Sequence, residues 1–190
     1  MSFVEAVEIF AFVTGIAYVV LEILQKNAMW VVVILTGAAC AASFGIQHSW
    51  GMAALNLYYV VMSFVGIYRW RKDGEKVEEG KIHLRTLPLS TALWSALAFV
   101  LGSLLFIFVL RALGDGVSEL DAVASVLSVI ATWWLTRSYP QQWILWIVAD
   151  TLTTILCIVS GQYFLALLYV AYAGSAVYGW FHWIKKGETV

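Results

Sequence analysis

The chain has 190 residues, of which 62% are hydrophobic and only 12% are charged, with a formal net charge of -1 and a mean hydropathy of +0.85. A soluble domain has about a quarter of its residues charged, so this composition excludes one and predicts an integral membrane protein embedded in the lipid bilayer. The near-zero net charge, with no basic patch outside one loop, excludes nucleic acid as a partner.

A membrane-spanning helix needs about 20 apolar residues, and seven stretches of the chain meet this need. The hydrophilic segment RKDGEKVEEGKIHLR lies between the third and fourth stretches, and its mixed charge is typical of a solvated linker, with His83 in water. The sequence therefore predicts an all-α integral membrane protein with seven transmembrane helices. We expect them at residues 5–24, 28–46, 51–70, 90–110, 120–136, 141–159 and 163–184.

The basic residues of the connections indicate how the helices cross the membrane. All but Arg111 fall on one side, in alternating connections. Because cytoplasmic loops carry the excess of Lys and Arg, the N-terminus is expected outside and the C-terminus in the cytoplasm. The residues on the cytoplasmic side are Lys26, Arg69, Arg71, Lys72, Lys76, Lys81, Arg85, Arg137, Lys185 and Lys186.

The chain also contains an internal repeat. The segment GIYRW at 66–70 resembles GWFHW at 179–183, an offset of 113 positions (179 minus 66) that also pairs an acid, Glu8 with Asp121, and a tryptophan, Trp30 with Trp143. A single helix between two three-helix units restores the chain direction, so the plan is 3+1+3, with parallel repeats related by an axis along the membrane normal, as in SWEET transporters. We expect a first repeat at 1–71, a cytoplasmic loop and linker helix at 72–112, and a second repeat at 118–186.

Polar and aromatic side chains share single faces of the third, sixth and seventh predicted helices, at spacings of three and four residues. Indole faces attract cations, with about 2 kcal/mol available when the pair is desolvated, and a carboxylate adds a counter-charge. The pattern predicts a site for a flat cationic solute between the repeats. The candidate substrate-binding residues are Trp143, Trp146, Asp150, Asn56, Tyr59, Ser63, Tyr169 and Tyr172.

Other residues have structural interpretations. Trp30, Trp70, Trp180 and Trp183 are expected as interfacial anchors near helix ends. Glu22 is expected to extend to the membrane surface, Glu8 and Asp121 to brace the repeats, and a structural hydrogen bond is the alternative role for Asp150. The histidines lack metal-ligand spacing and no catalytic or nucleotide-binding motif is present, so neither an enzyme nor a metal or cofactor site is predicted.

The sequence resembles the Pnu vitamin transporters over nearly the whole chain. The resemblance is strongest over residues 119–183 and extends to NLYYVVMSFVGIYRW and KIHLRTLPLS; its most specific motif is W-x-x-W with a polar residue four positions later, here Trp143, Trp146 and Asp150. It implies a SWEET-like seven-helix fold, a homotrimer in the bacterial cytoplasmic membrane, and facilitated diffusion of a vitamin trapped by intracellular phosphorylation. It also implies that Trp143, Trp146 and Asn56 line the substrate site.

The resemblance leaves thiamine, nicotinamide riboside and riboflavin as candidate substrates. The nicotinamide riboside branch has Asn where Asp150 stands and Gln where Asn56 stands, so the resemblance favours the thiamine-transporting branch, with nicotinamide riboside as the alternative. Neutral riboflavin gains less from Asp150. A function of a different class is a non-transporting membrane subunit or sensor.

Overall fold

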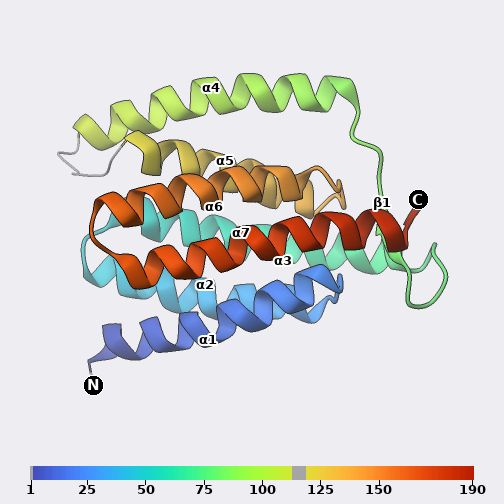
Figure 1. Ribbon diagram of the computed structural model, residues 1–190, viewed down its shortest axis with the longest axis horizontal. Coiled ribbons are helices and arrows are strands. Elements are labelled where there is room, and N and C mark those ends of the chain that lie inside the picture. Colours follow the sequence, from blue (N-terminus) through green and yellow to red (C-terminus); the bar gives the residue numbers. More distant parts are fainter. Residues whose placement is uncertain (1, 113–118) are drawn as a thin grey trace.

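The computed structural model describes residues 2–112 and 119–190 and, within them, shows seven α-helices that run roughly parallel and antiparallel to one another (Figure 1). Each predicted helix is present, with ends shifted by at most a few residues. The helices are α1 (Phe3–Ile23), α2 (Ala28–Ile46), α3 (Trp50–Gly74), α4 (Leu89–Ala112), α5 (Glu119–Leu135), α6 (Gln142–Val159) and α7 (Tyr163–Lys186).

The apolar composition of these helices makes this a multi-pass membrane protein. In a bilayer the backbone must satisfy its hydrogen bonds internally, which a helix achieves within one segment. Among the described residues, six helices are long and apolar enough to cross a membrane. The exception is α5, with 17 described residues. It packs between α4 and α6, and it also contacts α3.

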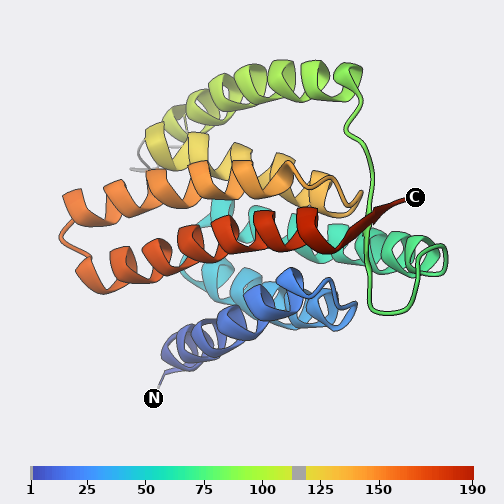
Figure 2. The ribbon, with the colours of Figure 1, turned by 45° about the vertical axis from the view of Figure 1, so that its right-hand side comes forward.

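The helices form two groups of three with α4 beside them. Within each group the middle helix packs on both neighbours, α2 on α1 and α3, and α6 on α5 and α7. The groups meet through contacts of α3 with α5 and of α1 with α7. In both views α4 lies at the edge of the bundle, next to α5 (Figures 1 and 2). The predicted 3+1+3 order of the SWEET-like plan thus matches the packing.

Equivalent positions of the two groups share unusual local geometry. Trp30 lies on Gly66 so closely that an added Cβ would overlap the indole, and Trp143 lies on Gly179 in the same way, 113 positions later. Left-handed backbone recurs at the same offset, in Gln25 (φ 50°) and Ser138 (φ 56°). These matches support the predicted duplication. Its limits at 1–71, 72–112 and 118–186 stay a prediction, and the boundary at 118 lies outside the described residues.

An apolar cluster closes the end of the bundle at which α1 ends and α2 begins, which we call the strap end. Trp30, Trp70 and Trp183 are almost completely buried in it, and Trp180 packs against it. Trp70 Nε1 donates to Leu135 O and Trp183 Nε1 donates to Ile23 O, both at 3.0 Å. The prediction of interfacial anchors was therefore wrong for the three buried tryptophans, because their indoles pack between the ends of helices from opposite groups.

The segment 75–88, here called the strap, runs across this end between α3 and α4 (Figure 1). Its strand β1 (Ile82–Leu84) pairs in parallel with β2 (Gly187–Thr189), which directly follows α7, and His83 is opposite Glu188. Ile82 and His83 are buried. The sequence-based prediction of a solvated linker was wrong here, because backbone pairing and bundle contacts hold the middle of the strap.

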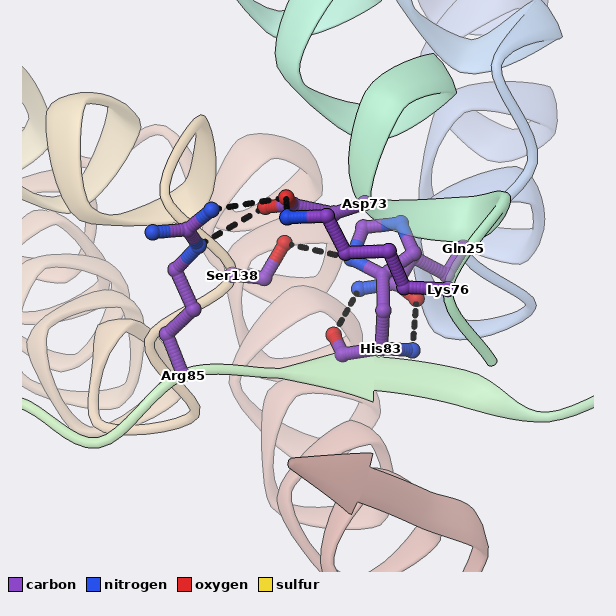
Figure 3. Close-up of polar contacts among 6 residues, drawn as sticks. All are labelled: Gln25, Asp73, Lys76, His83, Arg85 and Ser138. Carbon is purple, nitrogen blue, oxygen red and sulfur yellow. Dashed lines mark hydrogen bonds and ion pairs between the residues drawn. The ribbon is translucent and has the colours of Figure 1, made fainter. Parts of the chain in front are cut away.

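Side chains from both groups fix His83 (Figure 3). Its backbone N–H donates to Gln25 Oε1 at 2.9 Å and its carbonyl accepts from Gln25 Nε2 at 3.0 Å. Its ring nitrogen Nδ1 is hydrogen-bonded to Ser138 Oγ at 2.9 Å. Beside it, Arg85 donates two hydrogen bonds to the buried Asp73, at 2.8 and 2.7 Å. The strap therefore connects the α1–α2 turn to the α5–α6 turn.

Alanine in place of Gly66 or Gly179 is expected to destabilise the protein. The new methyl group would overlap the indole of Trp30 or Trp143, and overpacking of this kind costs about 1–3 kcal/mol. Thermal unfolding of purified protein in detergent measures the loss. Gly174→Ala, also in α7 but with open space around its Cβ position, is the matched control and should be nearly neutral. Equal melting temperatures for Gly174→Ala and Gly179→Ala would contradict the packing argument.

Acid is expected to weaken the fold through His83. Burial, aided by the positive charge of Arg85 and opposed by Asp73, lowers the pKa of His83 to about 4, against about 6.5 in an unfolded chain. The unfolded state therefore binds the extra proton first, and stability falls as the pH drops below about 6.5. Between pH 7.5 and pH 5 this group contributes a loss of about 2 kcal/mol. Melting curves at the two pH values should show a smaller difference in His83→Gln than in the wild type; identical differences would refute the assignment.

Candidate functional site

A cavity of about 600 Å³ lies between the two groups of helices. Six helices line it, namely α1, α2, α3, α5, α6 and α7, and α4 adds only Phe106. Lining residues extend to the N-terminal end of the bundle, where Phe44 and Ser49 flank the α2–α3 turn. At the other end the cavity stops at Glu22 and Trp143, above the apolar cluster. The cavity thus reaches toward the N-terminal end and is closed at the strap end.

The structure brings seven of the eight predicted site residues to this cavity: Trp143, Trp146, Asp150, Asn56, Tyr59, Tyr169 and Tyr172. Ser63 is the exception. Its side chain is completely buried and donates a hydrogen bond to the Tyr59 carbonyl at 2.7 Å. Ser63 shares a helical face with Tyr59 but lies one turn closer to the strap end, where the apolar cluster has replaced the cavity. The structure therefore gives Ser63 a place in the helix packing.

Asp150 faces the cavity and not lipid. Its residue is 9% exposed, and it follows Trp143 and Trp146 along one face of α6, as the spacing predicted. The indole nitrogens of Trp143 and Trp146 are buried and have no hydrogen-bond partner among the described residues. This face of α6 therefore offers ring surfaces, two N–H donors and a carboxylate to a bound solute.

Sequence reasoning missed the role of Glu22. The expectation that it extends to the membrane surface was wrong, because the residue is 2% exposed and lines the cavity from α1. Its polar neighbours are Tyr18 and Gln142, and it is close enough to Asp150 for the two carboxylates to interact electrostatically. A carboxylate within a predicted span was the available signal, since such residues mark functional sites by default.

Further polar residues of the cavity wall were also absent from the predicted site. Thr14 and Thr36 join α1 to α2 through a hydrogen bond of 2.8 Å between their hydroxyl groups, and both line the cavity. Asp121, expected to brace the repeats, lines the cavity near its N-terminal end, whereas Glu8 is exposed. Isolated threonines give no sequence signal, because in helices they commonly bond their own backbone.

The two groups contribute unlike walls to the cavity. The positions 113 residues before Trp146 and Asp150 are Val33 and Gly37, and both line the cavity from α2. The α6 side is therefore aromatic and acidic where the α2 side is small and apolar. This asymmetry suits a solute with one polar, cationic portion. Among the described residues no group of three His, Cys, Asp or Glu side chains could hold a metal ion.

Comparison with known proteins places this geometry in a family. A model described as "Nicotinamide mononucleotide transporter" matches residues 5–185. A solved structure titled "Crystal structure of the Vitamin B3 transporter PnuC" superposes with a TM-score of 0.73 at 31% identity, covering 93% of this chain and 79% of that one. The helix arrangement is thus shared with a solved transporter.

Curated relatives agree with the match. The chain is 36% identical to the "Nicotinamide riboside transporter PnuC" of Neisseria mucosa, over 72% of this chain and 56% of that protein. It is 23% identical to the protein of the same name from Escherichia coli, over 99% of this chain and 87% of that one. The match to the Neisseria protein thus spans little more than half of its length.

Thiol labelling is expected to separate cavity residues from packed ones. With Cys40 and Cys157 replaced by alanine, Asn56→Cys should react with a membrane-impermeant maleimide added on the side of the N-terminus, because Asn56 lines the cavity. Ser63→Cys, two turns further along α3, should stay unlabelled because that position is buried outside the cavity. Labelling of Ser63→Cys at the same rate as Asn56→Cys, in folded protein, would contradict the described cavity.

Proposed function

The chain belongs to the nicotinamide mononucleotide transporter family, and we propose that it carries nicotinamide riboside across the membrane by facilitated diffusion. Membership of a transporter family also agrees with the prediction that the chain is not an enzyme. The observation that carries the proposal is the cavity between the helix groups, where two indoles and two carboxylates converge. Nicotinamide riboside has a flat, positively charged pyridinium ring, which matches both features.

Physical chemistry supports a cation in this cavity. Trp143 and Trp146 offer indole faces, and a desolvated cation on an indole gains about 2 kcal/mol. Asp150 and Glu22 are buried carboxylates near each other, and a cation between them relieves their repulsion. The volume of about 600 Å³ lies within the range of small-molecule sites.

The comparisons favour nicotinamide riboside over thiamine, which the family resemblance had favoured. The argument for thiamine rested on Asp150 and Asn56 at positions where the nicotinamide riboside branch has Asn and Gln. Thiamine and nicotinamide riboside are both cations, so a carboxylate suits either. The curated relatives matched here are named nicotinamide riboside transporters, and none of them supports the thiamine branch.

The energetics and assembly follow from the same proposal. Within the described residues the helices carry no ATP-binding motif, and we propose downhill movement with intracellular phosphorylation as the trap. The basic strap end would face the cytoplasm of a bacterium, and the cavity would then receive its substrate from outside. A homotrimer with one pathway per chain remains part of the proposal.

Counterflow in proteoliposomes tests this function. Vesicles that contain the purified protein and unlabelled nicotinamide riboside should accumulate labelled nicotinamide riboside from outside without any ion gradient, and empty vesicles should not. Strict dependence on a proton or sodium gradient would exclude facilitated diffusion. Counterflow of thiamine but not of nicotinamide riboside would identify thiamine as the substrate. Absence of counterflow with nicotinamide riboside, thiamine and riboflavin would favour a non-transporting subunit or sensor.

Asp150→Ala provides a residue-level check by binding of nicotinamide riboside to purified protein. Alanine removes the polar group that faces the cavity, so the dissociation constant for nicotinamide riboside is expected to rise by at least about tenfold, whereas Asp150→Asn introduces the residue of the nicotinamide riboside branch and should retain binding. Glu8→Ala removes an exposed carboxylate of α1 that does not line the cavity, and should leave the dissociation constant unchanged.

A further inference from the structure

Glu22, its neighbour Gln142 and the cavity-lining Trp146 all carry buried polar atoms that lack hydrogen-bond partners. The buried atoms Glu22 Oε1, Gln142 Nε2 and Oε1, and Trp146 Nε1 make no hydrogen bond to any described residue. Gln142 is completely buried and is a neighbour of Glu22. Leaving such groups unsatisfied costs about 1–3 kcal/mol each, so a polar ligand group that enters the cavity would gain by bonding to them.

The internal repeat shows that the fold does not need this polar pair. The positions 113 residues away from Glu22 and Gln142 are Leu135 and Met29. Both are buried as deeply as their polar counterparts, and both belong to the apolar cluster at the strap end. The same local packing is thus built once from apolar residues and once from polar ones. Only the polar version faces the cavity, where Glu22 is part of the wall.

The arrangement of donors and acceptors indicates the chemistry of the missing partner. Glu22 supplies an acceptor, and Trp146 supplies an N–H donor from the opposite group. A primary carboxamide has the complementary pair, an amino group that donates and a carbonyl oxygen that accepts. A ligand carboxylate in the same place has no N–H to donate to Glu22, and it would bring a further acidic group beside Glu22 and Asp150.

We propose that Glu22 is a specificity-determining residue that accepts a hydrogen bond from the carboxamide of the substrate and rejects the corresponding carboxylic acid. This inference rests on the proposed function, and places the amide end of nicotinamide riboside at the closed end of the cavity. The pyridinium then lies toward Asp150 and the indoles. Nicotinic acid riboside, which differs only in having a carboxylate, is the discriminating probe.

Binding of the two ribosides to purified protein tests the assignment. The wild type should bind nicotinamide riboside at least about tenfold more tightly than nicotinic acid riboside, the scale of a lost charged hydrogen bond. Glu22→Gln keeps an acceptor oxygen but removes the charge, and should reduce this ratio. Glu22→Leu introduces the residue found at the equivalent position, Leu135, and is therefore compatible with the packing. This variant should raise the dissociation constant for nicotinamide riboside by about ten- to hundredfold.

Controls separate failure of this inference from failure of the proposed function. Glu8→Gln makes the same chemical change on an exposed part of α1 and should leave both affinities unchanged. Melting curves establish that each variant is folded. If the wild type binds neither riboside, the proposed function fails. The other outcome is that the wild type binds nicotinamide riboside, and that folded Glu22→Gln and Glu22→Leu bind it equally well and with the same preference over nicotinic acid riboside. In that case the proposed function stands and the role of Glu22 is refuted.

Discussion

Each group of three helices depends on an indole that rests directly on a glycine. Trp30 occupies the space beside Gly66, and Trp143 occupies the space beside Gly179. Because glycine has no side chain, the indole from the middle helix reaches the backbone of the third helix at this position. The contact therefore fixes how the two helices are aligned along their axes. The apolar cluster then forms where both groups present their tryptophans, and it closes one end of the cavity. In lipid, where apolar burial drives little association, such close contacts are a main source of stability.

Polar side chains in this protein are concentrated where lipid is absent. Between residues 93 and 109 the exposed positions on α4 are apolar, and they include Leu93, Leu101 and Phe108. The carboxylates Glu22 and Asp150 instead face the interior, on the cavity wall. The cost of a charge in hydrocarbon explains this division. Because Glu22 and Asp150 cannot face lipid at low cost, a cation bound in the cavity is the partner that can neutralise them.

The helices and most of the cavity could be predicted from the sequence, because apolar length and three-to-four spacing are local properties. Seven predicted helices and seven of eight predicted site residues follow that rule. Ser63 and Glu22 do not, since depth along a helix depends on where neighbouring helices close the cavity. His83 was placed in water because its neighbours in sequence are charged, whereas its partners Gln25 and Ser138 come from two distant turns. Long-range contacts of this kind leave no periodic signal.

The strap has a consequence for the order of biosynthesis. Strand β1 precedes α4, but its partner β2 follows α7, so more than half of the chain is made between the two strands. Ser138, which holds the ring of His83, is also synthesised long after His83. The first helix group must therefore enter the membrane with its strap end unfinished, and this end of the protein closes last. Ribosome-bound chains halted before β2 would carry an accessible β1, and completion of the chain would bury it.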